Sequence, residues 1–314
     1  MEKRRFKKLR ISLTDTCNMA CTYCVPEDDA DGIRSQLKPS LTAGDMVKII
    51  KALHQELKLE KIRITGGEPL MYPNIVHLIK EIKLLGINDI ALTTNAYYLE
   101  NLASRLKQAG VKSINISIDA LDKEIFKKMT RKDMLAQTLK GIYAAIHEGF
   151  PIKINAVILK HVNSSQIIPL IKFGIQHQIP VRFLELMKMG YLHHNYQDYS
   201  FSQAEILEEV NQEFSTHRKL RKISATANYW EIDKTNYKFG IIANETEPFC
   251  SDCDRLRLDS YGKLYGCISA IKGISVLQKI KNKENIEPEL SLALKQKQPI
   301  RFIGNEMSMR HIGG

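Results

Sequence analysis

Strand-like and helix-like patterns alternate along the first 187 residues, and this rhythm leaves few folds open to the chain. Six segments have the residue pattern of strands: 9–14, 61–65, 89–94, 112–119, 152–159 and 181–186. Helical spacing of apolar residues lies between them, at 46–59, 73–85, 138–148 and 167–177. Repeated strand–helix units with short turns form parallel sheets with right-handed crossovers, so an α/β fold is predicted. A doubly wound sheet and a full or partial barrel both fit, and both place sites at the C-terminal ends of the strands.

The rhythm breaks after residue 187. A helix with a capping box is expected from Ser202, and shorter strand-like segments follow at 229–233 and 237–242. Tyr261-Gly262 is typical of a hairpin turn. We therefore place a domain boundary near residues 215–225, which divides the chain into 1–220 and 221–314.

Composition excludes several classes of protein. The chain is 44% hydrophobic, which excludes a wholly disordered chain, and no apolar stretch approaches the roughly 18 residues of a membrane span. The basic N-terminus has no apolar stretch behind it, so a cytoplasmic location is expected. A net charge of +11 favours an anionic partner, namely a nucleic acid, a phosphorylated metabolite or a lipid surface, although charge can also serve solubility alone.

The six cysteines form two distant triplets. In the first, Cys17, Cys21 and Cys24 follow the first strand at positions i, i+4 and i+7. One loop can wrap three thiolates around a [4Fe-4S] cluster and leave one iron open to a substrate. Zinc is the alternative, but zinc sites usually pair cysteines two apart and close with a fourth ligand.

The second triplet, Cys250, Cys253 and Cys267, also leaves one ligand position open. Arg255 and Arg257 lie between its members. If residues 255–258 form a strand, both guanidiniums share one face and can clamp a phosphate. A solvated basic edge strand is the alternative interpretation.

The sequence Gly66-Gly67-Glu68-Pro69 follows the second predicted strand. Two glycines let backbone carbonyls approach a ligand closely, and they also suit a tight turn between strand and helix. Because the first cysteine triplet also predicts a ligand site, we favour the interpretation that these glycines contact a ligand.

These motifs, with Ser117 on a later strand, resemble the radical S-adenosylmethionine (SAM) superfamily and its Cys-x3-Cys-x2-Cys signature. The resemblance implies that SAM chelates the open iron of the first [4Fe-4S] cluster and is split to a 5′-deoxyadenosyl radical. It also implies that SAM contacts Tyr23, Gly67, Ser117 and Met187.

Over nearly its whole length the chain resembles one family within that superfamily, the GTP 3′,8-cyclases of molybdenum cofactor biosynthesis. The matching segments are 9–15, 61–70, 92–95, 115–120, 153–157 and 182–187, with both cysteine triplets, the arginine pair and the terminal Gly313-Gly314. The resemblance implies a six-stranded partial α/β barrel with a C-terminal extension that carries a second [4Fe-4S] cluster. GTP would lie between the clusters, in contact with Arg10, Arg63, Thr93, Lys153, Arg255, Leu256 and Arg257. Gly313 and Gly314 would enter the active site and assist catalysis.

The implied reaction converts GTP to (8S)-3′,8-cyclo-7,8-dihydroguanosine 5′-triphosphate, with 5′-deoxyadenosine and methionine as co-products. The implied partners are an electron donor, such as flavodoxin or ferredoxin, and the downstream cyclic pyranopterin monophosphate synthase. A homodimer is a possible assembly. Neither a membrane nor a nucleic acid is expected as a partner. Two alternatives remain at this point. One is another radical SAM enzyme with an auxiliary [4Fe-4S] cluster, such as a peptide-modifying one, and the other is a basic zinc-binding module that interacts with RNA.

Overall fold

The computed structural model describes residues 5–27, 41–306 and 308–312, and within them twelve strands form one sheet. In spatial order the strands are β12 (Ile274–Ser275), β11 (Lys263–Tyr265), β10 (Arg255–Leu258), β1 (Lys8–Ser12), β2 (Lys61–Thr65), β3 (Asp89–Thr94), β4 (Val111–Ser117), β5 (Ile152–Ile158), β6 (Val181–Glu185), β9 (Lys238–Ile242), β8 (Asn228–Ile232) and β7 (Thr216–Lys219). The predicted α/β class is thus confirmed, and the sheet is mixed rather than wholly parallel.

Strands β1 to β6 pair in sequence order and in parallel, as the strand–helix rhythm predicts. The parallel part then continues at both edges, because β10 pairs with β1 and β9 pairs with β6 in the same sense. The remaining strands add antiparallel hairpins at the two ends. The C-terminal third of the chain therefore extends the same sheet on both sides.

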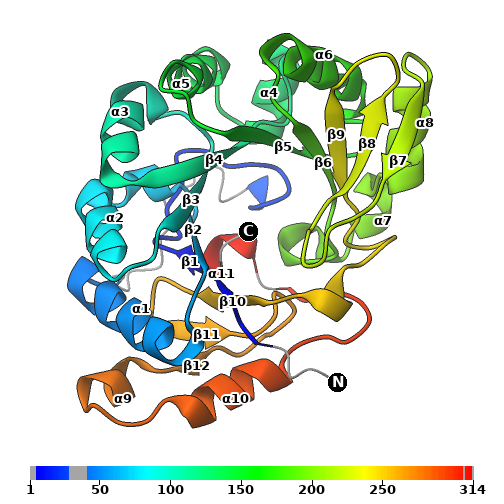
Figure 1. Ribbon diagram of the computed structural model, residues 1–314. Coiled ribbons are helices and arrows are strands. Elements are labelled where there is room, and N and C mark those ends of the chain that lie inside the picture. The colour runs from blue at the N-terminus through cyan, green and yellow to red at the C-terminus, as the bar shows by residue number, and fades with distance from the viewer. Residues whose placement is uncertain (1–4, 28–40, 307, 313–314) are drawn as a thin grey trace.

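The sheet curves around a central space, with a layer of helices on its outer side (Figure 1). The larger outer helices are α1 (Ala43–Leu57), α2 (Ile75–Leu84), α3 (Leu99–Ala109), α5 (Leu135–His147) and α6 (Ile167–His177). The shorter α4 (Lys123–Thr130) and α8 (Gln203–Asn211) also follow parallel strands, and α9 (Leu277–Lys281) and α10 (Glu287–Lys295) follow the C-terminal strands. The last helix, α11 (Met309–Ile312), lies inside the curve of the sheet (Figure 1). Within the described residues, none of these helices has the length and apolarity that a bilayer span needs.

Local signals explain where several helices begin and end. The Thr42 side chain accepts a hydrogen bond from the Asp45 amide at the start of α1, and Ser202 and Glu205 form the predicted capping box of α8. The helix predicted over 73–85 begins two residues later, because Asn74 takes a left-handed conformation with φ of 58°. Helix α4 escaped the sequence analysis because only three of its eight residues, Ile125, Phe126 and Met129, are strongly apolar.

Successive side chains of each strand point alternately into the hydrophobic core and toward the cavity. In β2, Ile62 and Ile64 are fully buried in the core, whereas Lys61 and Arg63 point to the opposite side. The same alternation in β10 buries Leu258 and Leu256. The inner face of the sheet is therefore free to carry polar side chains toward the centre.

Candidate active site

The curve of the sheet encloses a cavity of about 1270 Å³. All six cysteines line it, as do the glycine pair after β2 and the arginine pair of β10. Ligand pockets usually measure roughly 300–1,000 Å³, so this cavity has room for more than one ligand. The fold brings the two cysteine triplets to one site although they lie more than two hundred residues apart in the sequence.

The end of α4 holds the loop of the first cysteine triplet. Ala20 and Thr22 donate backbone hydrogen bonds to the carbonyls of Thr130 and Met129, at 3.0 and 2.9 Å. Nη1 of Arg131 donates to three carbonyls of the same loop, including that of Val25 at 2.8 Å. The loop is thus fixed by backbone contacts that no sequence motif indicated.

Gly66 and Gly67 pack against the same loop from the other side. The Gly67 amide donates to the Thr14 carbonyl at 2.6 Å, and a Cβ on Gly67 would lie 2.3 Å from the Thr16 carbonyl oxygen. The sequence analysis favoured ligand contact as the reason for these glycines. The structure adds a second reason, since no side chain fits between this turn and the segment that leads into Cys17.

The buried carboxylate of Glu68 ties this turn to the end of β3. Its side chain accepts from the Thr94 hydroxyl at 2.7 Å and from the amides of Asn95 and Leu70 at 2.8 and 3.0 Å. Burial raises the pKa of Glu68 to about 7, although these three hydrogen bonds oppose the shift. Asn95 in turn donates to the Asn18 side chain at 2.8 Å, next to Cys17.

The spacing of the sulfurs distinguishes two kinds of metal centre. In neither cysteine triplet do all three sulfurs lie within 4.8 Å of one another. Around a single tetrahedral zinc ion with Zn–S bonds of about 2.3 Å, the sulfurs would be roughly 3.8 Å apart. The wider spacing and the all-thiolate donor sets fit iron–sulfur clusters better.

Electrostatics indicates that the first triplet needs a cation. Burial raises the pKa of Cys17 to about 11, and burial together with the neighbouring Cys17 raises that of Cys24 to about 12. A metal centre supplies the positive charge that lets such thiols ionise. At the second triplet burial opposes ionisation, but Arg255 and Lys297 lower the pKa of Cys253 to about 7.

The residues expected to contact SAM all line the cavity: Tyr23, Gly67, Ser117 and Met187. The Tyr23 hydroxyl donates to Asp119 at 3.0 Å, and the Val157 amide donates to the other oxygen of that carboxylate at 2.8 Å. Burial raises the pKa of Asp119 to about 6. Asp119 is a buried acid beside the first triplet that the sequence analysis did not select.

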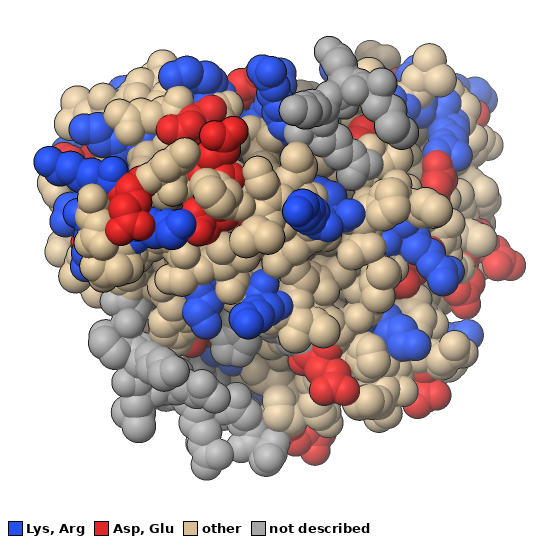
Figure 2. Space-filling view, turned by 90° about the horizontal axis from the view of Figure 1, so that it is seen from below, with Lys and Arg blue, Asp and Glu red and all other residues tan. Residues whose placement is uncertain are grey.

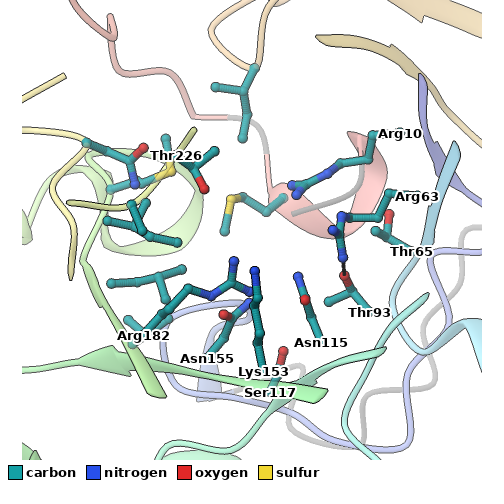
Figure 3. Close-up of a pocket in the computed structure, with 18 of the residues that line it drawn as sticks. Arg10, Arg63, Thr65, Thr93, Asn115, Ser117, Lys153, Asn155, Arg182 and Thr226 are labelled. Atoms are coloured by element: carbon teal, nitrogen blue, oxygen red, sulfur yellow. Dashed lines mark hydrogen bonds between the residues drawn. The ribbon is translucent and has the colours of Figure 1, made fainter. Parts of the chain in front are cut away.

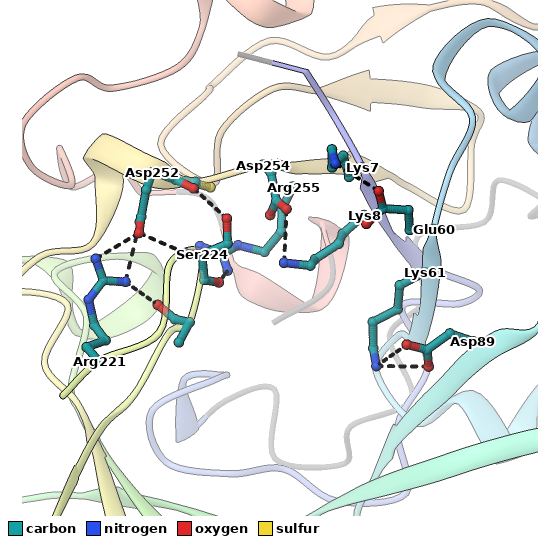
Figure 4. A network of polar contacts seen from close by, with 12 residues as sticks. Lys7, Lys8, Glu60, Lys61, Asp89, Arg221, Ser224, Asp252, Asp254 and Arg255 are labelled. Carbon is teal, nitrogen blue, oxygen red and sulfur yellow. Dashed lines mark hydrogen bonds and ion pairs between the residues drawn. The ribbon is translucent and has the colours of Figure 1, made fainter. Parts of the chain in front are cut away.

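The second triplet is built from two segments, one with Cys250 and Cys253 and one with Cys267. Cys250 lies in a short helix, η5 (Cys250–Asp252), Cys253 precedes β10, and Cys267 follows β11. Asp252 is held by Arg221 and by the Ser224 amide, each at 2.8 Å (Figure 4). Lys297 donates to the Cys253 sulfur at 3.2 Å, so a cation from the C-terminal region completes the surroundings of this triplet.

Strand register assembles the basic side chains. Arg257, Arg10 and Arg63 are register partners on the adjacent strands β10, β1 and β2, and Arg255, Lys8 and Lys61 form the next row. Like charges directly opposite one another on one face destabilise a sheet. Neighbouring cations on one face therefore need anionic groups beside them, from the protein or from a ligand.

Carboxylates pair with two cations of the outer row, Lys8 and Lys61. Lys61 contacts Asp89 at 2.9 Å and Lys8 contacts Asp254 at 2.9 Å (Figure 4). Arg10 and Arg63, by contrast, have no ion pair within the described residues, and both point into the cavity (Figure 3). Burial, with the neighbouring cation Arg182, lowers the pKa of Arg63 to about 10, although Asp89 opposes this shift.

Arg182 and Lys153 enlarge the same cluster from β6 and β5 and point toward Arg10 and Arg63 in Figure 3. Arg182 is 7% exposed, and Tyr229 is the neighbour that interacts favourably with its guanidinium, but its Nε and one Nη are buried without a direct hydrogen bond in the described structure. The sequence analysis had placed Arg182 only within a matching segment. Its position on a strand, two residues after a proline, gave no signal of its own, and only the register with Asn155 on β5 brings it to the site.

The other residues that the sequence analysis placed at the site differ in where the structure puts them. Thr93 lines the cavity and accepts a hydrogen bond from Arg63 at 3.4 Å. Leu256 does not line it, because the alternation of β10 turns this side chain into the core, where it is fully buried. Gly313 and Gly314 lie outside the described residues.

Comparisons with known proteins identify the family of the chain. A model of the Radical SAM superfamily matches residues 11–174, and one described as Molybdenum Cofactor Synthesis C matches residues 179–302. GTP 3′,8-cyclase of Staphylococcus epidermidis is 36% identical over 288 residues, which cover 89% of this chain and 84% of the relative. GTP 3′,8-cyclase of Aquifex aeolicus is 36% identical over 293 residues, which cover 91% of this chain and 89% of the relative.

Among solved structures, Streptococcus suis SuiB bound to the precursor peptide SuiA is similar with a TM-score of 0.66 and 16% identity, over 92% of this chain and 67% of that one. At this identity the likeness shows the fold alone. The fold, the first triplet and the superfamily match together define a radical SAM enzyme. The sequence relatives go further: the chain belongs to the GTP 3′,8-cyclase family, which acts in molybdenum cofactor biosynthesis.

Proposed function

We propose that the chain cyclises GTP with SAM bound at the first cysteine triplet and GTP held between that triplet and the second one. The observation that carries this proposal is a group of buried cations, Arg10, Arg63 and Arg182, that have no carboxylate partner in the described structure and line one cavity with both cysteine triplets. A triphosphate would supply the negative charge that these three side chains lack. Neither alternative from the sequence, a peptide-modifying enzyme or a zinc-binding RNA module, explains cations buried at this depth.

Each triplet would hold one [4Fe-4S] cluster through its three thiolates. When bound, the first cluster and SAM supply the one-electron chemistry that starts cyclisation at the ribose C3′. The role of Tyr23 is to keep Asp119 in place through the 3.0 Å hydrogen bond, beside the loop that carries the first triplet.

The basic residues position the substrate. Arg10, Arg63, Lys153 and Arg182 would bind the triphosphate, since charge-assisted hydrogen bonds to phosphate oxygens replace their mutual repulsion. Arg255 and Arg257 would hold the nucleoside end beside the second triplet. The Arg257 guanidinium also donates to the Ile312 carbonyl at 3.3 Å, so the same side chain contacts the C-terminal helix.

The face of the molecule in Figure 2 shows basic side chains scattered among acidic and uncharged ones, with no continuous basic stripe. A group of buried cations lines the cavity, which favours a small anionic substrate there. The electron donor (flavodoxin or ferredoxin), the downstream synthase, a homodimer and the division at residue 220 stay predictions.

Anaerobic incubation with GTP, SAM and a reductant tests the proposal. We expect 5′-deoxyadenosine and a 3′,8-cyclised guanosine triphosphate, and about eight iron atoms per chain for two clusters. About four iron atoms with full activity would contradict the second cluster. Formation of 5′-deoxyadenosine without any cyclised nucleotide would contradict GTP as the substrate.

A further inference from the structure

A second group of potential ligands lies outside the cavity. Within the described part of the chain, His193, His194 and Glu306 form a group of three potential metal ligands whose donor atoms all lie within 4.8 Å of one another. The histidines end the short helix η4 (Gly190–His193) and begin the turn after it, whereas Glu306 precedes α11. We propose that these three side chains bind one divalent transition-metal ion of the zinc type, which fastens the C-terminal segment to the segment after β6.

The chemistry of the three donors fits such an ion. Two imidazoles and a carboxylate are a common protein ligand set for zinc and similar divalent ions, with a further position left for water. Nε2 of His194 and Oε1 of Glu306 are 3.4 Å apart. That distance is longer than a usual N–H···O hydrogen bond of about 2.7–3.2 Å. It matches the roughly 3.3 Å between two ligand atoms that each lie about 2.0–2.1 Å from a tetrahedral ion.

His193 has an available nitrogen. Its Nδ1 is buried and has no hydrogen-bond partner in the described structure. A buried polar atom without a partner is costly, and coordination of a metal ion removes that cost. The two imidazole rings are 4.9 Å apart between centroids and nearly perpendicular, so neighbouring histidines can present nitrogens to one point without stacking.

The backbone around the group is already fixed. The Gly190 amide donates to the Asn305 carbonyl at 3.1 Å, and Met189 and Asn305 form an isolated parallel bridge. Asn305 is buried and donates to the Ile268 carbonyl at 3.0 Å, beside Cys267. Because both segments are held before any ion arrives, binding needs little reorganisation.

The position of the group gives the ion a structural role. Glu306 lies three residues before Met309, and both Met309 and Arg310 line the cavity. An ion held by Glu306 and the two histidines would fix the chain just before it turns inward. Without an ion, His194 and Glu306 are an exposed pair, with side chains 74% and 75% accessible, and such pairs contribute little to stability.

The test is a zinc titration of the iron-loaded holoprotein under anaerobic conditions, in competition with a chromophoric chelator. We expect one zinc ion per chain, bound at least about tenfold more weakly by His194→Ala and by Glu306→Gln, with unchanged iron content. His77→Ala, an exposed histidine of α2, is the matched control and should bind zinc like the wild type.

A second measurement tests whether zinc binds at this group of residues even if a variant loses zinc because it folds poorly. Zinc should slow hydrogen exchange in residues 304–312 of the wild type and of His77→Ala, but not of Glu306→Gln. Equal zinc affinity in the wild type and in His194→Ala would overturn the proposal. Zinc uptake accompanied by matching iron loss would do so too, because the ion would then occupy the cysteines.

Discussion

At the scale of single residues, Arg182 shows how a buried cation can mark a ligand. Two of its guanidinium nitrogens are buried without a direct hydrogen bond, and the side chain points toward Arg10, Arg63 and Lys153 (Figure 3). A folded chain retains such a group when a ligand supplies the missing acceptors. The phosphates of GTP are the acceptors that the proposed function provides.

We therefore predict that Arg182→Ala weakens GTP binding by about 10- to 100-fold, since a hydrogen bond to a charged group contributes about 1.5–3 kcal/mol. Equilibrium binding to the iron-loaded protein is the measurement. Affinity for guanosine, which has no phosphates, should not change. Arg105→Ala, an exposed arginine of α3, serves as the control. An equal loss for GTP and guanosine would assign Arg182 to the nucleoside end instead.

Glu68 makes stability depend on pH. Its pKa rises from about 4.5 to about 7 because the carboxyl is buried. The folded state therefore holds this proton more tightly than the unfolded state, and the resulting stabilisation is complete below pH 4.5 and is lost as pH rises through 7. Relative to Glu68→Gln, which does not titrate, we predict that the wild type loses about 2 kcal/mol of unfolding free energy between pH 5.5 and pH 8.

Chemical denaturation of both proteins at several pH values checks this prediction. The variant lowers stability at every pH, because an amide cannot accept all the hydrogen bonds that Glu68 accepts. Only the slope of the difference against pH therefore tests the shifted pKa. A difference that stays constant from pH 5.5 to 8 would mean that Glu68 titrates near its usual value.

At the scale of elements, the glycine turn after β2 and the first cysteine loop depend on each other. We predict that Gly67→Ala impairs assembly of the first cluster, because a Cβ would lie 2.3 Å from the Thr16 carbonyl oxygen and 2.7 Å from that of Asp15. Iron content should fall toward half, and SAM cleavage should be lost. Gly44→Ala is the control, since a Cβ there meets nothing within 4 Å. Full iron content in Gly67→Ala would show that the cysteine loop adjusts.

Elements with strong periodicity were predictable from the sequence. The strands at 61–65 and 89–94 and the helix at 167–177 have the predicted bounds, because each has a clear pattern and a turn signal beside it. Helix α4 and the anchoring by Arg131 were not predictable. They depend on backbone carbonyls of a loop more than a hundred residues away, and no residue type in the sequence signals such contacts.

At the scale of the whole molecule, the sequence identified the cysteines and most of the cations but not their arrangement. Spacing within a triplet is local and can be recognised directly. The rows of cations arise from β10 pairing with β1, a contact between the two ends of the chain. The Leu256 side chain points into the core, whereas Arg255 and Arg257 on the same strand line the cavity. The resemblance covered these three consecutive residues together and did not separate the two faces of the strand.

The C-terminal segment connects these distant parts at the cavity. Ser12 donates to the Arg310 carbonyl at 3.1 Å, Arg310 donates through Nε to the Asp15 carbonyl at 3.0 Å, and Arg257 contacts the carbonyl of Ile312. Two further residues, Gly313 and Gly314, follow this anchored helix.

We predict that deletion of Gly313 and Gly314 leaves iron content and GTP affinity near those of the wild type, because α11 and its three anchoring contacts remain. Formation of the 3′,8-cyclised product should fall sharply, whereas SAM cleavage persists, since that step belongs to the first triplet. Product and 5′-deoxyadenosine are measured in the same reaction, so their ratio reports the uncoupling. Replacement of both glycines by alanine should give the same loss if the segment needs to pass without side chains through a narrow space. A truncated enzyme that forms product at the full rate would show that the tail has no part in the reaction.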